Sequence, residues 1–322
     1  MRFSRLLRTG AVVAAAGLAL AACGGGDTNT GGGNGGTPEK LTIGIKFDQP
    51  GLAQKTPSGY EGFDVDVAKY IAKELGVEEA NIEFVEAKSA ERENLIKRGD
   101  VDFIVATYSI TDKRKAEVDF AGPYFIAGQD LLVRKDDTAI TGPEALNGKK
   151  LCSVTGSTSA QRVKEKYAAQ TDLQEYGGYS ECLSGLENGA VDAVTTDNTI
   201  LAGLAAANPG KFKVVGKTFS EERYGVGLKK GDTELRGKIN AAIEKMISDG
   251  SWAKAVEKHL GPAGFPTPSR PRSPRSRNSP EAVRHAVARR SRRATVVPPV
   301  RGARRCSTSA SLSRTTCSAR SG

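Results

Sequence analysis

Hydrophobic and polar positions follow two alternating periods from Lys40 onward. Leu41–Ile45 is a short apolar run typical of a buried strand, whereas Asp64–Leu75 repeats apolar residues at helical spacing and stops before Gly76. The alternation continues along the chain and predicts parallel α/β sheets with helices on both faces. Further strands are predicted at 81–85, 101–106, 150–154, 172–176 and 191–195, and further helices at 92–97, 159–168, 182–186 and 199–207.

A weak internal repeat indicates two halves that are built alike. The motif Gly-x-Val-Asp occurs at 99–102 and at 189–192, and each copy is followed by an apolar run that ends in a polar residue, Thr107 or Asp197. Helix–Gly–strand connections are common, so chance also explains the likeness. Two such halves would each present polar groups at the carboxyl end of a strand, where open α/β sheets bind ligands, and a cleft between them could close.

The first 23 residues indicate export. Three arginines precede an apolar stretch, Ala11–Ala22, which is too short to span a bilayer because about 20 residues are needed. Leu20-Ala21-Ala22-Cys23 resembles the bacterial lipobox, in which the cysteine thiol receives the lipid; the alternative is an ordinary secretory signal with a chance cysteine. We therefore predict a signal peptide at 1–22, lipidation of Cys23 and stable membrane anchoring by the acyl chains.

Both ends of the chain differ in composition from its middle. Eight of the thirteen residues from Gly24 to Gly36 are glycine, which predicts a flexible tether at 23–39 with a reach of roughly 20 Å. Residues 268–322 are rich in Arg, Pro and Ser, contain no Lys and lack apolar periodicity, so we expect a disordered tail. A frameshifted extension of the gene explains this tail; a basic arm that binds anionic lipid is the alternative.

The positive charge of the chain comes from its ends. The net charge is +10, but residues 268–322 carry fourteen Arg and one acidic residue, for a net +13. The segment Cys23–Thr267 carries a net −6. A nucleic-acid-binding role for the body therefore loses its main support.

Chemistry-bearing residues in the body favour binding over catalysis. His259 is the one histidine there and reads as a helix-terminal or surface side chain, so nucleophile–histidine arrangements, metal-ligand clusters and phosphate loops are not predicted. We expect no catalytic residue, no metal and no cofactor. Cys152 and Cys182 are the two cysteines between Lys40 and Thr267, and an oxidising compartment favours a disulfide between them.

Hydroxyl and charged groups gather after two predicted strands. Thr107 and Ser109 alternate onto one side of an extended segment and Arg114 follows one turn into a helix, where its planar guanidinium can bind a carboxylate in bidentate fashion. The structural alternative makes Thr111 a helix N-cap and Arg114 a surface cation. Residues 156–159 precede another helix, whose free N–H groups can bind an anion, or Ser157 merely caps it. Asp197 suits an ammonium group.

These segments resemble a known family. Gly62-Phe63-Asp64-Val65-Asp66 and Thr111-Asp112-Lys113-Arg114 to Phe120-Ala121-Gly122-Pro123-Tyr124 are similar to the polar-amino-acid solute-binding proteins of ATP-binding-cassette importers. The segment from Ile45 to Gly51, the two body cysteines and Asp249-Gly250-Ser251-Trp252 are similar to the glutamate-binding lipoproteins of high-GC Gram-positive bacteria. The likeness covers about Lys40 to Gly264.

The resemblance implies a type II periplasmic-binding-protein-like fold. Each of two lobes would be a sheet flanked by helices, and two crossing strands, near 128–133 and 224–228, would join them. Lobe 1 would comprise residues 40–127 and 222–267, and lobe 2 residues 128–221.

The resemblance also implies the ligand contacts. Arg114 would pair with an α-carboxylate, assisted by Ser109 and Thr158, while Asp197 and the Thr107 region would take the α-ammonium. Residues early in the chain and before the 92–97 helix would line the side-chain pocket; the candidates are Lys46, Asp48, Ser89 and Arg92, and the cations Lys46 and Arg92 would suit glutamate, unless both are simply solvated.

The implied function is that of a receptor. The protein would be a monomer on the extracytoplasmic face of the membrane, would bind glutamate, glutamine or aspartate, and would deliver it to an ABC permease without catalysis or nucleic-acid binding. The alternatives are an enzyme on the same fold, such as a cyclohexadienyl or arogenate-type dehydratase, and an amino-acid sensor independent of transport.

Overall fold

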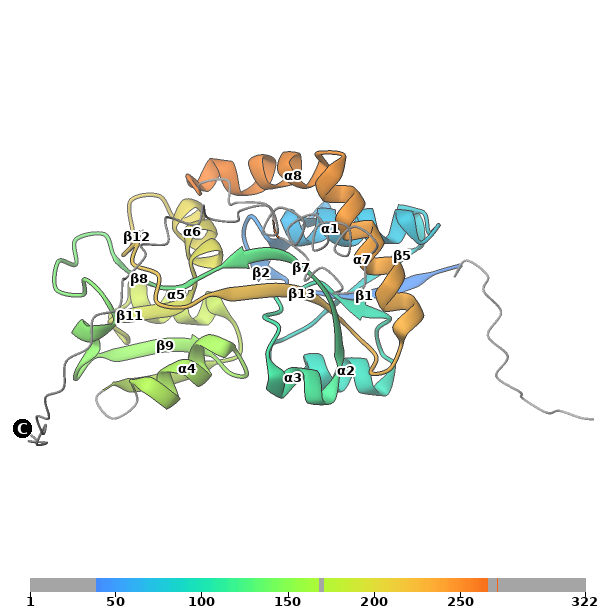
Figure 1. Cartoon of the computed structure of the whole chain (residues 1–322). Helices are drawn as coiled ribbons and strands as arrows, with labels where there is room; N and C mark the ends of the chain where they lie inside the picture. The colour runs from blue at the N-terminus through green and yellow to red at the C-terminus, as the bar shows by residue number, and fades with distance from the viewer. Residues whose placement is uncertain (1–38, 168–170, 266–270, 272–322) are drawn as a thin grey trace, which may run out of the picture. The chain divides into compact units, whose positions relative to one another are not determined.

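The structure is a computed structural model that describes residues 39–167, 171–265 and Pro271 (Figure 1). The predicted signal peptide, the lipidation site Cys23, nearly all of the tether and nearly all of the tail lie outside the described residues. Within the described part, helices and strands alternate as the sequence pattern predicts. Three predicted strands, 41–45, 150–154 and 172–176, have the predicted bounds, and the predicted strand at 101–106 is shorter, Phe103–Ile104.

The first of two five-stranded sheets is made from both ends of the body. Its strand order is β5-β1-β6-β13-β7, so the late strand β13 lies between two strands from the first half of the sequence, β6 and β7. The part of the protein built around this sheet is called the first half below. Its strands are β1 (Leu41–Ile45), β5 (Ile82–Glu86), β6 (Phe103–Ile104), β7 (Asp119–Ala127) and β13 (Glu222–Leu228).

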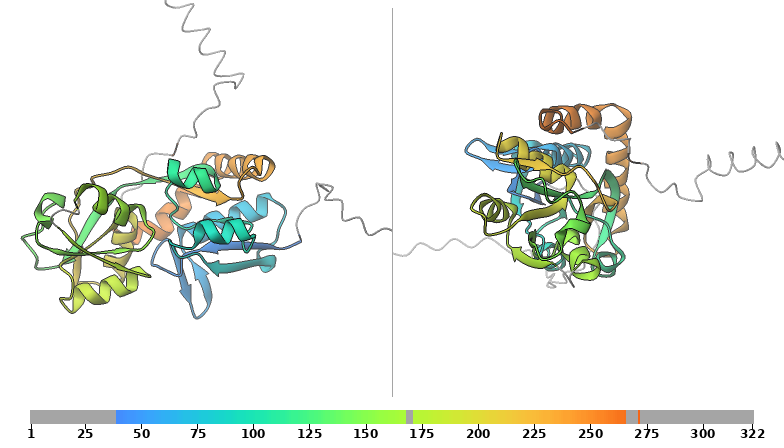
Figure 2. Two further views of the ribbon diagram at one scale, coloured as in Figure 1. Left: turned by 90° about the horizontal axis from the view of Figure 1, so that it is seen from below. Right: turned by 90° about the vertical axis from the view of Figure 1, so that its left-hand side faces the viewer.

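The second five-stranded sheet comes from the middle of the chain and has the order β10-β9-β11-β8-β12. The part built around it is the second half, which Figure 2 (left) shows in green and yellow beside the first. Its strands are β8 (Gln129–Arg134), β9 (Lys150–Val154), β10 (Asp172–Tyr176), β11 (Ala193–Asp197) and β12 (Phe212–Val214).

Both sheets are mixed, so the expectation of purely parallel sheets is wrong. In each sheet three strands are parallel, in the spatial order second-first-third, and the next strand runs against them: β13 in the first sheet and β8 in the second. The antiparallel strands are those with which the chain enters a sheet from the other half. Parallel strands end at the edge where the halves meet, so a strand that arrives across that edge must run the opposite way.

The chain passes between the sheets at two places. The first lies at Gly128, where β7 leads into β8 (Gln129–Arg134), the strand that contains most of the expected range 128–133. The second follows β12 and leads into β13 (Glu222–Leu228), the strand that contains the expected range 224–228.

Helices flank both sheets. In the first half, α1 packs against α7 and α8, and in the second half α5 packs against β9 and α6 against β8. The helices are α1 (Phe63–Glu74), α2 (Arg92–Arg98), α3 (Asp112–Glu117), α4 (Thr158–Lys166), α5 (Tyr179–Glu187), α6 (Asn198–Ala207), α7 (Thr233–Ser248) and α8 (Ser251–Leu260), with 3₁₀ turns η1 (Glu79–Asn81), η2 (Pro143–Leu146) and η3 (Gly261–Ala263).

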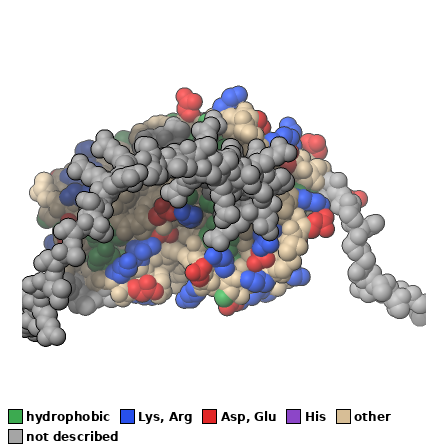
Figure 3. All heavy atoms as spheres, in the orientation of Figure 1, with side chains coloured by type: hydrophobic (Ala, Val, Ile, Leu, Met, Phe, Trp, Pro, Cys, Tyr) green, Lys and Arg blue, Asp and Glu red, His purple; other side chains and the backbone are tan. Residues whose placement is uncertain are grey.

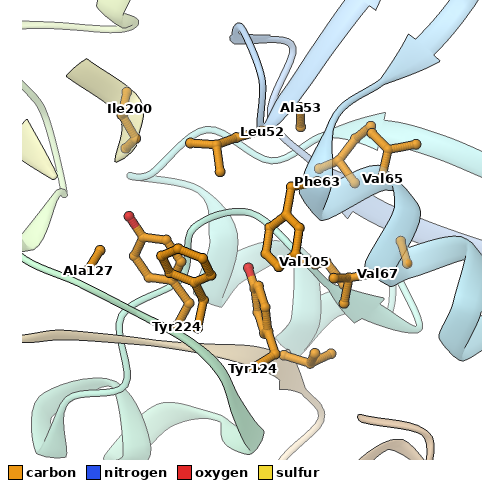
Figure 4. Close-up of a cluster of buried hydrophobic side chains, with 14 of the residues drawn as sticks. Leu52, Ala53, Phe63, Val65, Val67, Val105, Tyr124, Ala127, Ile200 and Tyr224 are labelled. Carbon is orange, nitrogen blue, oxygen red and sulfur yellow. The ribbon is translucent and has the colours of Figure 1, made fainter. Parts of the chain in front are cut away.

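A small hairpin sheet and a shared core connect the halves. The hairpin consists of β2 (Asp48–Gln49), β3 (Ala53–Thr56) and β4 (Gly59–Glu61). The main apolar cluster includes Phe63 and Tyr224 from the first half and Ile200 from the second (Figure 4). The contacts between the halves therefore include buried apolar surface.

The internal repeat has a structural basis. Gly99 ends α2 with a φ of 77°, and Gly189 comes shortly after α5 with a φ of 79°. Both have a left-handed conformation, which glycine adopts without a steric penalty. Three residues later, Asp102 and Asp192 each accept a hydrogen bond through Oδ2 from the backbone N–H of the neighbouring parallel strand, at Thr42 (2.7 Å) and Lys150 (2.8 Å). The repeat thus performs the same task in both halves, which explains why the two sheets begin alike.

The two body cysteines form the predicted disulfide. Cys152 in β9 and Cys182 in α5 are bonded, with their Cα atoms 5.6 Å apart. The bond attaches α5 to β9, which lies between β10 and β11 in the second sheet. His259 lies in the last turn of α8, as the helix-terminal interpretation predicts, but it is mostly buried, and its Nε2 lies 2.8 Å from Oδ2 of Asp66.

Candidate functional site: polar side chains where the two halves meet

The carboxyl ends of β6 and β11 lie where the halves meet, and each carries one of the predicted site residues. Asp197 is the last residue of β11 and the N-cap of α6, and its side chain makes no capping hydrogen bond. One carboxylate oxygen, Oδ2, accepts a 2.7 Å hydrogen bond from the hydroxyl of Tyr224 in the first half. The other, Oδ1, is buried and has no hydrogen-bond partner among the described residues.

The environment of Asp197 opposes its negative charge. The residue is 3% exposed, and burial, followed by the nearby charge of Glu222, raises the pKa of its carboxyl to about 7. A cation placed at Oδ1 would stabilise the ionised carboxylate and so lower its pKa again. This carboxylate therefore suits an ammonium group.

Thr107 follows β6 with a strained backbone. Its φ is 46°, which is unusual for a β-branched residue. Its N–H donates to Oδ2 of buried Asp64 at 2.7 Å, and the hydroxyl of Tyr124 donates to the other Asp64 oxygen at 2.8 Å. Burial raises the pKa of Asp64 to about 7. Asp64 and Tyr124 thus hold the turn after β6 in place.

Arg114 lies in α3 and contacts both halves, so it is not a surface cation. Its Nη1 donates to the carbonyl of Ser109 at 2.8 Å, its Nη2 donates to the carbonyl of Gly156 in the second half at 3.0 Å, and its Nε lies 3.3 Å from Glu93 Oε1. A guanidinium has five N–H donors, so donors remain for a carboxylate. Thr111 also caps α3, by accepting from the Arg114 N–H, so the capping role and a binding role coexist.

Ser109 and Thr158 face each other across the halves beside Arg114. Their hydroxyl oxygens are 3.5 Å apart, and Ser157 caps α4 by accepting from the N–H of Ala160 at 2.9 Å. A cavity of about 430 Å³ opens here; it is lined by Ser89, Glu93, Arg114, Gly156, Thr158 and Arg162, among others. Two of the three predicted carboxylate-binding residues, Arg114 and Thr158, therefore line this cavity.

Two further cations are buried nearby, so neither is solvated. Lys46 is 4% exposed and donates to the hydroxyl of Ser89 at 3.0 Å. Burial, followed by the charge of Arg92, lowers the pKa of Lys46 to about 7. Arg92 is 2% exposed; its Nη1 donates to the carbonyl of Ala106 at 2.9 Å, while its Nε is buried without a hydrogen-bond partner among the described residues.

Asp48, the fourth side-chain-pocket candidate, joins the halves instead. Its Oδ2 accepts a 2.8 Å hydrogen bond from the backbone N–H of Tyr179, at the start of α5. Gly178 lies directly against the same oxygen, which a Cβ at that position would approach to 2.7 Å. The contact places a carboxylate at a helix N-terminus, where the helix dipole favours it.

The structure adds site residues that the sequence pattern did not identify. Tyr224 binds Asp197, Asp64 holds Thr107, and Gln49 is 1% exposed with its Nε2 unpartnered among the described residues. Gln49 Oε1 lies 3.2 Å from Thr107 Oγ1. A tyrosine on a late strand and an aspartate in the first turn of α1 carry no sequence signal for a contact that only folding creates.

Three further properties of the described residues are their surface charge, the hydropathy of their helices and their potential metal ligands. Where grey atoms do not cover the face seen in Figure 3, acidic and basic side chains are interspersed. Among residues 39–167 and 171–265 no helix has both the length and the hydropathy needed to cross a bilayer. The same residues contain no group of three or more His, Cys, Asp or Glu side chains that could hold a metal ion.

Comparisons with known proteins agree on one family. The family described as bacterial extracellular solute-binding proteins, family 3, matches residues 41–262. The chain is 46% identical over 272 residues to the glutamate-binding protein GluB of Corynebacterium efficiens, covering 80% of this chain and 92% of that protein. It is 41% identical over 224 residues to the glutamine-binding protein GlnH of Bacillus subtilis, covering 69% and 81%. Among solved structures, an ancestral arginine-binding protein bound to glutamine superposes with a TM-score of 0.65 at 39% identity, covering 70% of this chain and 99% of that one.

Proposed function

Because the chain belongs to the bacterial extracellular solute-binding proteins of family 3, we propose that it binds glutamate between its halves and delivers it to an ABC permease. The similarity to GluB supports glutamate as the ligand. The chain's relatives are named as binding proteins, and the proposal contains no chemical step.

The observation that carries the choice of ligand is the balance of buried charges. Three buried cations, Lys46, Arg92 and Arg114, surround the site, whereas Asp197 is the buried carboxylate with an unpartnered oxygen there. Glutamate has two carboxylates and one ammonium. Its two carboxylates can pair with these cations, and its ammonium can pair with Asp197.

Each ligand group has its own set of residues in this proposal. Arg114, with the hydroxyls of Ser109 and Thr158, binds the α-carboxylate. Asp197 and the Thr107 turn bind the α-ammonium. Lys46 and Arg92 bind the side-chain carboxylate, and the unpartnered Arg92 Nε supports this role.

Binding and closure are coupled because the groups come from both halves. Arg114, Lys46 and Arg92 belong to the first half and Asp197 and Thr158 to the second. A ligand that contacts both halves favours the state in which they meet, and this closed surface is what the permease recognises.

Calorimetry tests the choice of ligand. The purified chain with Cys23→Ser is titrated with glutamate, glutamine, aspartate and asparagine. Glutamate should bind most tightly, in the micromolar range or better, which is about −8 kcal/mol. Lys46→Met should reduce the preference for glutamate over glutamine because the side-chain carboxylate loses one of its two cations. Tighter binding of glutamine by the unmutated chain would instead match the likeness to GlnH.

Proton exchange on binding gives a second test. At pH 8 Lys46, with a pKa of about 7, is mostly neutral, and a carboxylate ligand recharges it, so glutamate binding should take up a proton. At pH 6 Asp197 is mostly protonated, and an ammonium ligand ionises it, so binding should release a proton. Titrations in buffers of different ionisation enthalpy measure both signs. Lys46→Met should abolish the uptake and leave the release.

We also propose that the protein is a monomeric lipoprotein, anchored through Cys23 on the outer face of the cell membrane. The sequence Leu20-Ala21-Ala22-Cys23 and the glycine-rich segment that follows support this proposal. Metabolic labelling with a fatty acid should mark the expressed chain and fail with Cys23→Ser. Unchanged labelling of that variant would contradict the anchor site.

A further inference from the structure

The side chain of Tyr108 is completely buried next to two of the cations of the proposed site. The centroid of its ring lies 4.2 Å from Cζ of Arg92 and 5.0 Å from Cζ of Arg114. Both distances are within the roughly 6 Å range in which the negative face of an aromatic ring attracts a cation. One ring therefore contacts two guanidinium groups.

Two guanidinium groups this close together repel each other. After burial, the charge of Arg92 is the largest cause that lowers the pKa of Arg114, to about 10. Glu93 is the acidic side chain that pairs with Arg114 in the described residues, and no ion pair is found for Arg92 there. An aromatic ring stabilises both cations without adding a carboxylate that would compete with an acidic ligand.

The ring also packs closely against two other residues. Phe120 contacts it edge-on, with the centroids 4.7 Å apart. Gly227 in β13 allows the close approach, since a Cβ there would lie 2.5 Å from Cε1 of Tyr108. The hydroxyl of Tyr108 makes no hydrogen bond of normal geometry in the described residues, so the ring rather than the hydroxyl accounts for the contacts.

We propose that Tyr108 is a positioning residue for ligand selectivity: its ring holds Arg92 and Arg114 side by side, so that each guanidinium is directed at one carboxylate of a dicarboxylic amino acid. The inference rests on the proposed function for the roles of the two arginines. It assigns the spacing of the two anion-binding groups to a side chain that does not itself contact ligand.

The test uses variants of the full chain that separate the contributions of the Tyr108 ring, its hydroxyl and its volume. Tyr108→Phe keeps the ring, Tyr108→Leu removes it, and Tyr108→Met removes it while filling the buried space with a flexible side chain. Phe120→Leu is the matched control, because it removes a neighbouring ring for which no cation contact is found among the described residues. Binding of glutamate and glutamine is measured by calorimetry, and folding by thermal melting.

Tyr108→Phe should bind glutamate with an affinity within about twofold of that of the unmutated chain. The Leu and Met variants should bind glutamate at least about tenfold more weakly, because they lose the cation–π contacts between desolvated groups. The Leu and Met variants should also show a smaller preference for glutamate over glutamine, whereas Phe120→Leu should keep the preference of the unmutated chain. Equal weakening in Tyr108→Phe, or full preference in a folded Leu or Met variant, would overturn the inference.

A second readout needs no ligand and separates the inference from the proposed function. In the ligand-free protein, NMR spectra of ¹⁵N-labelled arginine should show two Nε–Hε signals displaced by the Tyr108 ring. The displacement should persist in Tyr108→Phe and disappear in Tyr108→Met. If the unmutated chain shows displaced signals but binds no glutamate, the proposed function fails and the ring contact stands; absence of displaced signals overturns the inference itself.

Discussion

The ends of β6 and β11 are equivalent positions in the two halves, yet they have opposite chemistry. Each lies five residues after the aspartate of a Gly-x-Val-Asp motif. At the first, Thr107 adopts a φ of 46° and its N–H is bound by Asp64 of the same half. At the second, Asp197 has ordinary extended backbone, is bound by Tyr224 of the other half, and retains an oxygen without a partner among the described residues.

The repeat therefore places a polar residue at each strand end without deciding its role. Thr107 is held in place by contacts of its own half, so its turn meets the ammonium in a fixed geometry. Asp197 has a carboxylate oxygen with no partner among the described residues, so a ligand can complete its contacts.

Asp197→Asn should weaken glutamate binding at least about 100-fold. The amide keeps the shape but loses the charge that pairs with the ammonium, and breaking a buried hydrogen-bonded charge pair costs about 2–5 kcal/mol. Calorimetry measures the loss. Asp192→Asn is the matched control, since it alters the same strand connection through its bond to Lys150 and should leave affinity nearly unchanged. Equal affinity of Asp197→Asn and the unmutated chain would remove Asp197 from the site.

The stability of the ligand-free protein should pass through a minimum near pH 7. Asp64 and Asp197 have folded pKa values of about 7 against an ordinary 3.8, so between these values the folded state holds protons that the unfolded state has lost, and the free energy of unfolding falls as pH rises. Lys46 has a folded pKa of about 7 against an ordinary 10.5, so above pH 7 the unfolded state holds the extra proton and stability rises again.

Urea unfolding at pH 5, 7 and 9 measures this minimum. Asp197→Asn should make the acid side shallower, and Lys46→Met should flatten the alkaline side. A stability that rises steadily from pH 5 to pH 7 would contradict the assignment of raised pKa values to the two aspartates.

Thr107→Gly should be more stable than Thr107→Ala by about 1 kcal/mol. Both variants lose the hydroxyl, but only alanine retains the left-handed strain, which costs an L-residue roughly 1–2 kcal/mol. Urea unfolding of the two variants side by side measures the difference. If alanine were the more stable, the turn would not be strained and Thr107 would resemble Asp197 in this respect.

Asp48→Ala should weaken binding by a few-fold, the smallest effect of the series. The variant removes one hydrogen bond between the halves, to the N–H of Tyr179, at a site that does not touch the proposed ligand. A single such bond contributes about 0.5–1.5 kcal/mol. Calorimetry should show a weaker but equally selective complex; a change in the ratio of glutamate to glutamine affinity would instead place Asp48 in the side-chain pocket.

The sequence alone determined the local structure of this protein and the charged and polar groups that are available to bind a ligand. Strand and helix periods located most elements of both sheets, the Gly-x-Val-Asp repeat marked the two equivalent strand ends, and Arg114 and Asp197 could be selected by residue type. These features depend on neighbours within a few positions, or on chemistry that a residue keeps wherever it lies. The pairing of Cys152 with Cys182 was accessible for a similar reason, since the body offers no other choice.

Only the tertiary structure decided which of these groups meet. That β13 and β8 run against their neighbours follows from the chain crossing between sheets, and that Tyr224 reaches Asp197 follows from that crossing. The burial of Lys46 and Arg92, which the resemblance named as candidates but could not distinguish from solvated cations, also depends on packing. Long-range contacts of this kind leave no local pattern, because they join residues far apart in the chain through the sum of many weak apolar contacts.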